Sequence, residues 1–364
     1  MTSVQAVDHE FMARALQLAR RGLFTTTPNP RVGCVVVKEG AIVGEGWHER
    51  AGEPHAEIHA LNAAGALARG ATAYLSLEPC SHHGRTPPCA DALIEAGVAR
   101  VVAAMRDPNP QVAGAGLARL AAAGIETATG LLEAEARELN IGFVARMTRG
   151  RPWLRLKVAA SLDGKTALGN GKSQWITSAE ARRDGHRFRA RACAILTGGG
   201  TVRDDDPRLT VRDVPGARQP LRVVVDSHLD TPLEAKVLEG GNALIAAAAE
   251  DAGKIAALRA QGVEVLVLPN AQGKVDLARL MAELGRRGIN EVHAEAGFKL
   301  NGSLLAAGLV DELLIYLAPS LIGGGRGMFN LPELADLAAK RELKIVDLRR
   351  VGADIRILAR PLPA

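Results

Sequence analysis

Apolar runs typical of buried strands alternate with helical patterns along this 364-residue chain, and the alternation starts twice. In the first part, a helical pattern over roughly residues 8–22 precedes the apolar run "RVGCVVV". Further strand patterns then alternate with helical patterns that begin near "HAEIHALNAAG" and "CADALIEAG". Strands and helices in this order predict an α/β domain built around a central sheet.

A second α/β region follows the segment "GRP" at residues 150–152. A helical tail leads into this segment, and after it strand-like runs such as "WLRLKVAAS", "LRVVVDS" and "VEVLVLP" resume between helical patterns. Because Gly and Pro interrupt regular structure, "GRP" is the best candidate for a domain boundary. The length also exceeds that of one ordinary domain. We therefore expect two domains, residues 1–148 and 149–364, each with its own sheet.

The composition excludes several classes of protein. No apolar run approaches the roughly 18 residues needed to span a membrane. The N-terminus reads as an amphipathic helix and lacks the features of a signal peptide, so we expect a cytoplasmic protein without membrane contact. Aromatic residues are only 3% of the chain, too sparse for the stacking platforms of single-stranded nucleic-acid binding. The net charge of +5 fits an anionic small molecule at least as well as a polymer.

Four cysteines occur in the chain, and two of them need a specific explanation. Cys34 and Cys193 lie within apolar strand-like runs and are interpreted as small core residues. Cys80 and Cys89 bracket the segment "CSHHGRTPPC". In a reducing compartment such a pair is more often a metal site or a catalytic site than a disulfide. Taken alone, the pair leaves a structural role open.

His55 and Glu57 stand at the start of a predicted helix, directly after a proline. Residues two apart point to different faces of a regular helix, so both can reach one site only at the irregular first turn. Together with Cys80 and Cys89, His55 supplies three ligands suited to Zn²⁺, which leaves the fourth tetrahedral position for water as in catalytic sites. Glu57 is then placed to carry protons. An isolated His-Ala-Glu would more often be a solvated helix start, but the ordered set of His55, Glu57, Cys80 and Cys89 favours a catalytic centre.

The ordered set resembles the H-x-E…P-C…C pattern of zinc-dependent nucleobase deaminases, although the two cysteines are nine residues apart rather than three. The segments "TPNPRVGCVVV", "GWHERAGEPHAE" and "PCSHHGRTPPC" are similar to the deaminase domain of the bifunctional riboflavin biosynthesis family. This resemblance implies a cytidine-deaminase-like three-layer fold and a pyrimidine substrate that carries a ribosyl phosphate. It also implies substrate contacts at Asn29, His48, His82 and Arg85, although for each of the last two a solvated loop residue is a nearly equal alternative.

The second region contains glycine-rich segments after predicted strands, but no G-x-G-x-x-G motif follows its leading strand. The segments "KVAASLDGKTA", "SQWITSAEARRD", "ILTGGGTVRDDDPRLTVR", "AEAGFKLNGSLLAAGLVDE" and "LIGGGRGMF" resemble the reductase domain of the same family. This implies a dihydrofolate-reductase-like fold that uses NADPH. The sequence has "AEAG" where that family has "VEGG", so Ala296 adds a methyl group at a point of expected close backbone approach.

The resemblance assigns two further sets of contacts in this region. The implied NADPH contacts are Ala160, Trp175, Thr201, Asp205, Ser227 and the turn made of Gly297, Phe298, Lys299, Leu300, Asn301, Gly302 and Ser303. The implied substrate contacts are Ser173, Arg189, Leu209, Arg212 and Glu295. The two arginines suit a phosphate, which a guanidinium can bind with two donors. For Arg189, in an arginine-rich helix, a surface position is an equal alternative.

The resemblance covers nearly the whole chain and implies a hydrolase and an oxidoreductase in one protein. The first reaction is zinc-dependent hydrolytic deamination of the 2-amino group of a diaminopyrimidine that carries a phosphoribosylamino group. The second is NADPH-dependent reduction of the ribosyl group to ribityl, with Asp205 as the nearest candidate for a proton donor. A homo-oligomer is also implied. The alternatives are a tRNA-type nucleic-acid deaminase with an accessory domain, and a non-catalytic zinc scaffold in which Glu57 has no role.

Overall fold

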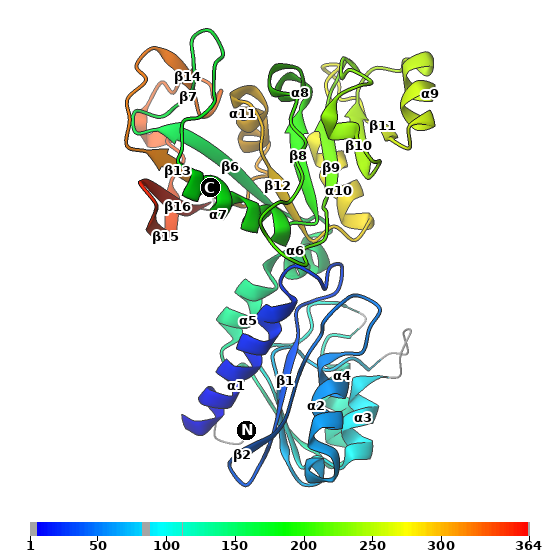
Figure 1. The fold of residues 1–364 in the computed structure, drawn as a ribbon. Helices are drawn as coiled ribbons and strands as arrows, with labels where there is room; N and C mark the ends of the chain where they lie inside the picture. The colour runs from blue at the N-terminus through cyan, green and yellow to red at the C-terminus, as the bar shows by residue number, and fades with distance from the viewer. Residues whose placement is uncertain (1–5, 82–87, 111, 363–364) are drawn as a thin grey trace. The chain divides into compact units, whose positions relative to one another are not determined.

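The chain divides into two compact units, Met1–Gly150 and Arg151–Ala364. The computed structural model describes residues 6–81, 88–110 and 112–362. Each unit is built around its own sheet with helices packed against it (Figure 1). Among the helices in these ranges, none combines the length and the apolar composition that crossing a membrane requires.

The first unit contains a five-stranded mixed sheet. In spatial order its strands are β2 (Ala41–Trp47), β1 (Gly33–Lys38), β3 (Thr72–Leu75), β4 (Arg100–Ala103) and β5 (Glu126–Thr129). β1 pairs antiparallel with β2 and β3, whereas β3, β4 and β5 run parallel. Alternate residues of β1 enter two different cores: Val35 and Val37 pack on one face, and Cys34 and Val36 on the other. Both faces of the sheet are therefore covered.

The helices of the first unit complete three layers. They are α1 (Ala6–Ala19), α2 (Ala56–Ala64), α3 (Cys89–Ala96), α4 (Ala115–Ala122), α5 (Glu133–Leu139) and α6 (Ile141–Arg149), with short 3-10 turns η1 (Arg20–Gly22) and η2 (Gly65–Ala68). α2, α3 and α4 cover one face of the sheet, and α1 and α5 cover the other (Figure 1). This arrangement confirms the three-layer prediction.

Two glycines of β2 allow α2 to lie unusually close to the sheet. A Cβ atom at Gly44 would be 2.2 Å from the carbonyl oxygen of Ala60, and one at Gly46 would be 2.4 Å from that of Ala56. Any larger residue would push the helix away. The glycines of "VGEGW" thus set the distance between the sheet and the N-terminus of α2, where His55 and Glu57 stand.

The structure differs from the sequence-based expectation in two places in this unit. The edge strand β5 was not predicted, because "ETAT" is only half-buried and lacks an apolar pattern. The helical tail over residues 131–150 is two helices, α5 and α6, separated at Asn140. The Asn140 side chain accepts from the backbone N–H of Arg31 at 2.8 Å and donates to its carbonyl oxygen at 2.9 Å. These bonds hold Asn140 in the core and interrupt the helix.

The second unit contains a nine-stranded sheet and a two-stranded ribbon. In spatial order the sheet comprises β11 (Glu264–Val267), β10 (Ala243–Ala247), β9 (Leu221–Val225), β8 (Ala194–Gly198), β12 (Glu291–Ala294), β6 (Trp153–Ser161), β13 (Glu312–Ala318), β16 (Asp354–Pro361) and β15 (Leu343–Val351). The strands from β11 to β13 in this order are parallel, and the last two pairings are antiparallel. The ribbon pairs β7 (Lys165–Leu168) with β14 (Gly325–Gly327).

Helices cover both faces of this sheet as well. They are α7 (Ala179–Arg191), α8 (Gly199–Asp205), α9 (Ala252–Ala260), α10 (Leu277–Arg286) and α11 (Phe298–Ala306), with 3-10 turns η3 (Lys236–Leu238) and η4 (Leu337–Ala339). α10 and α11 pack on one face through Leu280 and Leu304. α8 and α9 pack on the other face through Val202 and Leu258. The strands between them are apolar on both sides, as expected for a parallel sheet.

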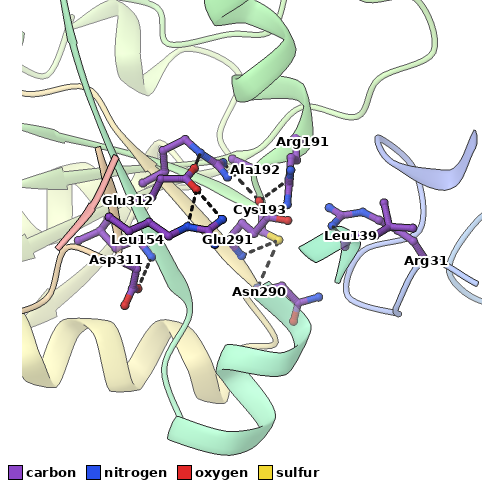
Figure 2. A network of polar contacts seen from close by, with 12 residues as sticks. Arg31, Leu139, Leu154, Arg191, Ala192, Cys193, Asn290, Glu291, Asp311 and Glu312 are labelled. Carbon is purple, nitrogen blue, oxygen red and sulfur yellow. Dashed lines mark hydrogen bonds and ion pairs between the residues drawn. The ribbon is translucent and has the colours of Figure 1, made fainter. Parts of the chain in front are cut away.

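A buried network of charges joins the amino ends of three adjacent strands (Figure 2). Arg155 of β6 donates to Glu312 of β13 at 2.5 Å and lies 3.3 Å from Glu291 of β12. Arg191 donates to Glu291 at 2.7 Å, and Arg360 to Glu312 at 3.0 Å. Each buried carboxylate is thus shared by two arginines, which offsets the cost of removing it from water. The network fixes the start of β12, the strand that leads to Glu295.

Candidate metal centre and arginine-lined cleft

The N-terminus of α2 places His55 and Glu57 side by side in the first unit. His55 precedes the helix with extended backbone (ψ 164°), and Glu57 lies in its first turn. Because His55 is outside the regular helix, its ring reaches the same site as Glu57. The Glu57 carboxyl is 3% exposed and lies beside the Cys89 thiol. Its Oε2 atom has no hydrogen-bond partner among the described residues, as expected for a group that acts on a bound molecule.

The structure brings the three predicted metal ligands together. His55 Nδ1 lies 3.1 Å from Cys89 Sγ and 3.7 Å from Cys80 Sγ, and the three ligand atoms all lie within 4.8 Å of one another. A tetrahedral zinc ion with ordinary bond lengths holds a nitrogen and a sulfur ligand about 3.5 Å apart. The donor set and its spacing therefore fit one zinc ion. Both cysteines are free thiols, which excludes a disulfide between them in this structure.

The environment of the two thiols favours a thiolate at this site. A hydrogen bond from Cys89 lowers the pKa of Cys80 to about 4, against the effect of burial, and His55 contributes in the same direction. The shared proton correspondingly raises the pKa of Cys89. Burial raises the pKa of Glu57, although the nearby His55 opposes this. A carboxyl group with a raised pKa is suited to accept a proton and to return it.

Two of the predicted substrate contacts lie beside the ligands. His48 is buried, and its ring makes an edge contact with that of His55, with 5.3 Å between the centroids. His48 Nδ1 is 3.1 Å from the carbonyl oxygen of Pro54, so Nδ1 carries the proton and Nε2 can accept from Asn29 Nδ2 at 3.1 Å. Burial also lowers the pKa of His48 and keeps it neutral. The other two predicted contacts, His82 and Arg85, lie outside the described residues.

The second unit has a cleft of about 710 Å³, a volume typical of small-molecule sites. Many of the residues predicted from the sequence line it. They are Ser173, Trp175, Arg189, Thr201, Asp205, Leu209, Arg212, Glu295, Gly297, Phe298 and Asn301. Ala160, Ser227, Lys299, Leu300, Gly302 and Ser303 are not among its lining residues.

Four of the predicted cofactor contacts share one feature of the topology. Ala160, Thr201, Ser227 and Gly297 stand near or just beyond the carboxyl ends of β6, β8, β9 and β12, which are neighbours in the parallel sheet. Ligands of open α/β sheets bind along this edge. α8 and α11 begin there, and their free N–H groups suit the phosphates of a dinucleotide. These residues therefore fit NADPH.

The predicted turn from Gly297 to Ser303 is part of a helix. Gly297 precedes α11, and the residues after it form its first turns. Gly302 faces the chain at Asn330, where a Cβ atom would be 2.1 Å from the carbonyl oxygen, so its glycine serves packing. Asn301 is buried and donates to the carbonyl oxygen of Met328 at 3.1 Å, while its Oδ1 atom has no hydrogen-bond partner in the described part of the chain.

An ion pair between Arg189 and Glu295 forms one wall of the cleft. Arg189 donates to both carboxylate oxygens of Glu295, and its third nitrogen donates to the carbonyl oxygen of Thr210 at 3.0 Å. Lys157 Nζ lies 3.6 Å from Glu295 Oε2 and also lines the cleft. Burial alone would raise the pKa of Glu295, but the charges of Arg189 and Lys157 hold it well below its usual range. The sequence analysis did not predict Lys157 as a residue of this site. The available signal was a charged residue within the apolar strand "WLRLKVAAS".

His186 is a second lining residue that the sequence analysis missed. Burial and the charges of Arg189 and Arg212 lower the pKa of His186 to about 4, against the opposing effect of Glu295 and Asp213. The neutral Nδ1 atom accepts from the backbone N–H of Arg212 at 3.2 Å.

The stability of the second unit should therefore fall in mildly acidic solution. Unfolded histidine takes up a proton near pH 6.5, whereas folded His186 does so only near pH 4. The contribution of His186 to the free energy of unfolding is therefore fully present above pH 6.5 and is lost as the pH falls from there to about 4. We expect His186→Gln, which keeps an acceptor for Arg212, to flatten this part of the curve of unfolding free energy against pH. Urea unfolding of both proteins at several pH values measures it, and identical slopes would contradict the assignment.

Two family models match the chain. The cytidine and deoxycytidylate deaminase zinc-binding region matches residues 5–105, and the RibD C-terminal domain matches residues 152–357. Curated relatives match over nearly the full length. The riboflavin biosynthesis protein RibD of Escherichia coli (strain K12) is 53% identical, with 96% of this chain and 98% of the relative covered. The RibD of Haemophilus influenzae is 47% identical, with 99% of each covered.

Solved structures with the same arrangement of elements are also known. Acinetobacter baumannii RibD, form 1, superposes with a TM-score of 0.92 at 42% identity, covering 98% of this chain and 99% of that one. A diaminohydroxyphosphoribosylaminopyrimidine deaminase/5-amino-6-(5-phosphoribosylamino)uracil reductase from Thermotoga maritima superposes with a TM-score of 0.87 at 35% identity, with the same coverage.

Proposed function

This chain belongs to the RibD family of riboflavin biosynthesis proteins, and we propose that its two reactions are divided between residues 1–148 and 149–364. The protein is a bifunctional enzyme, a deaminase and a reductase, with zinc and NADPH as the cofactors. The fold class predicted from the sequence, a cytidine-deaminase-like domain followed by a dihydrofolate-reductase-like domain, is confirmed. The assignment of individual residues to the two reactions is our proposal.

In the deaminase domain, His55, Cys80 and Cys89 hold the zinc ion and Glu57 moves the proton. When bound, zinc supplies Lewis acidity that activates a water molecule for attack on the pyrimidine. Glu57 Oε2, buried and unpartnered in the described chain, takes one proton from the attacking water and gives it to the ring nitrogen, and then passes the second proton of that water to the amine, which leaves as ammonia. Asn29 and His48, which lie beside His55, orient the pyrimidine. The cluster of three ligands next to a buried glutamate carries this proposal.

In the reductase domain, the cleft holds NADPH and the phosphoribosyl substrate together. NADPH supplies, when bound, the hydride that reaches C1′ of the sugar. Glu295, held by Arg189 and Lys157, aligns the ribosyl group, and Arg212 binds the phosphate. Asp205 is our candidate for the proton donor: burial raises its pKa, against a hydrogen bond from Ser173 at 3.3 Å. A carboxyl group of raised pKa holds its proton closer to neutral pH.

The substrate class follows from the same features. We propose that the enzyme acts on a free phosphoribosylated pyrimidine rather than on nucleic acid, and that it works in the cytoplasm as a homo-oligomer. The small net charge of +5 and the 3% aromatic content support a small anionic substrate. The cationic groups that line the cleft, among them Arg212 and Lys157, support a phosphate on that substrate.

The proposed function is tested by assaying both half-reactions with the full-length protein. We expect ammonia release from the diaminopyrimidine substrate, and oxidation of NADPH that depends on the deaminated product. Asp205→Asn should slow single-turnover reduction at saturating NADPH by about 10²-fold or more and leave ammonia release unchanged. An unchanged hydride-transfer rate removes Asp205 from this role. A nucleic-acid deaminase would ignore the free pyrimidine, and a zinc scaffold would oxidise no NADPH.

A further inference from the structure

The buried carboxylate of Glu78, two residues before Cys80, is held by four backbone N–H groups. Its Oε2 atom accepts from Asp107 and Gly114, both at 3.0 Å. Its Oε1 atom accepts from Gly116 at 3.0 Å and from Leu117 at 3.2 Å. Glu78 is only 3% exposed, so these donors replace its water. Hydrogen bonds to an ionised carboxylate are stronger than bonds between neutral groups.

Two of the donors, Asp107 and Gly114, lie in the loop before α4, and the other two lie in α4 itself. Gly116 and Leu117 lie in the first turn of α4, whose N–H groups have no partners within the helix. A carboxylate at this end of a helix is also favoured by the helix dipole. Glu78 therefore links the segment that follows β3 to α4 and to the loop before α4.

The two segments touch directly at the residue between Glu78 and the metal ligand. A Cβ atom at Gly116 would lie 2.0 Å from the carbonyl oxygen of Pro79, so only glycine permits this approach. On its other side, Cys80 is attached to α3: its carbonyl oxygen accepts from Ala90 N–H at 3.1 Å and its Sγ from Cys89 N–H at 3.3 Å. The backbone that carries Cys80 is thus fixed between α4 and α3.

We propose that Glu78 is a positioning residue of the metal centre: by anchoring residues 78–80 to α4 and to the loop before it, Glu78 sets the position of Cys80 Sγ relative to His55 and Cys89. The inference rests on the proposed function, in which these three residues bind zinc. Glu78 itself touches neither the ligand atoms nor the substrate in this role and acts through Cys80. Outer contacts that orient metal ligands typically contribute about 10–100-fold to metal affinity.

The test is the metal affinity of Glu78→Gln in the full-length protein. The amide keeps the size of the side chain but turns an N–H₂ group towards two backbone donors, so half of the anchor is lost. We expect zinc affinity, measured by competition with a chromophoric chelator, to fall about 10–100-fold. The cobalt-substituted protein should also lose part of its thiolate-to-cobalt charge-transfer absorption. Glu78→Asp, which retains the charge, should recover part of both signals.

Asp8→Asn is the matched control. Asp8 is another buried carboxylate of the first unit; it lies on α1, on the opposite face of the sheet from α2 and α3, and accepts hydrogen bonds from Tyr74 and Arg100. The Asp8→Asn variant should have a lower melting temperature than wild type but the same zinc affinity and the same cobalt spectrum. Wild-type zinc affinity in Glu78→Gln, or equal losses in both variants, would overturn the proposal. If the wild-type protein binds zinc no better than Cys80→Ser, the proposed ligand set itself fails.

Discussion

Glu57→Gln is expected to abolish ammonia release while zinc remains bound at one equivalent. The Glu57 carboxyl is buried beside the three ligand residues, and its Oε2 atom has no hydrogen-bond partner among the described residues. An amide of the same size occupies the pocket but neither accepts nor returns a proton. Because a positioned acid–base group contributes about 10²–10⁴-fold, turnover should fall by at least this factor. The measurements are ammonia release and zinc content of the same preparation.

Two controls separate loss of proton transfer from loss of structure. Glu53→Gln replaces an exposed carboxylate just before the same helix and should retain full deaminase activity. In Glu57→Gln, NADPH oxidation with the deaminated substrate supplied directly should remain at the wild-type rate. Ammonia release near the wild-type rate in Glu57→Gln would show that another group carries the proton.

The clustering of the candidate metal ligands was predictable from sequence because their residue types are rare and each stands at a recognisable position. His55 and Glu57 begin one helix, and Cys89 begins another. The role of Glu78 was not predictable, because its partners are backbone N–H groups 29 to 39 residues away in the sequence. Backbone donors leave no signature in the residue types. Only the fold reveals that Gly116 must be a glycine because of Pro79.

The cleft of the second unit was predictable to a different extent. Glycines and polar residues after apolar runs identify the carboxyl ends of strands, and strand order then makes those ends neighbours. Pairings across the cleft could not be derived: Arg189 and Glu295 are separated by 106 residues, and an arginine-rich helix gives no reason to choose this arginine. The same limit applies to the edge strand β5, whose sequence has no apolar face to bury.

Arg189→Ala is expected to destabilise the second unit and to abolish reduction. The substitution removes the guanidinium from the largely buried Glu295, which retains Lys157 at 3.6 Å and the His293 ring at 3.3 Å. Breaking a largely buried ion pair by removing one partner typically costs about 3–5 kcal/mol of unfolding free energy, and Lys157 places this case at the lower end. Urea unfolding near neutral pH measures the loss. Deaminase activity, which we assign to the other unit, should be retained and shows that the first unit is intact, while a cooperative urea transition shows that the second unit has folded.

A double substitution separates stability from chemistry. Arg189→Met with Glu295→Gln removes both charges and should restore most of the unfolding free energy, because a buried ion pair adds little over an uncharged pair of similar size. Reduction should remain absent, because both the carboxylate and its guanidinium are lost. A double variant that regains NADPH-dependent reduction would show that the pair is structural only.

The pH dependence of the single variant provides an independent check. The pKa of folded Glu295 is well below its usual value because the charges of Arg189 and Lys157 outweigh the effect of burial. The contribution of the Glu295 carboxylate to the free energy of unfolding is therefore present at every pH above the unfolded glutamate pKa of about 4.3. It is lost as the pH falls below that value. The stability difference between the wild type and Arg189→Ala should accordingly be constant near neutral pH and shrink in acid. If the difference in unfolding free energy persists unchanged below pH 4, the loss of stability comes from the packing of the arginine stem and not from the charge of Glu295.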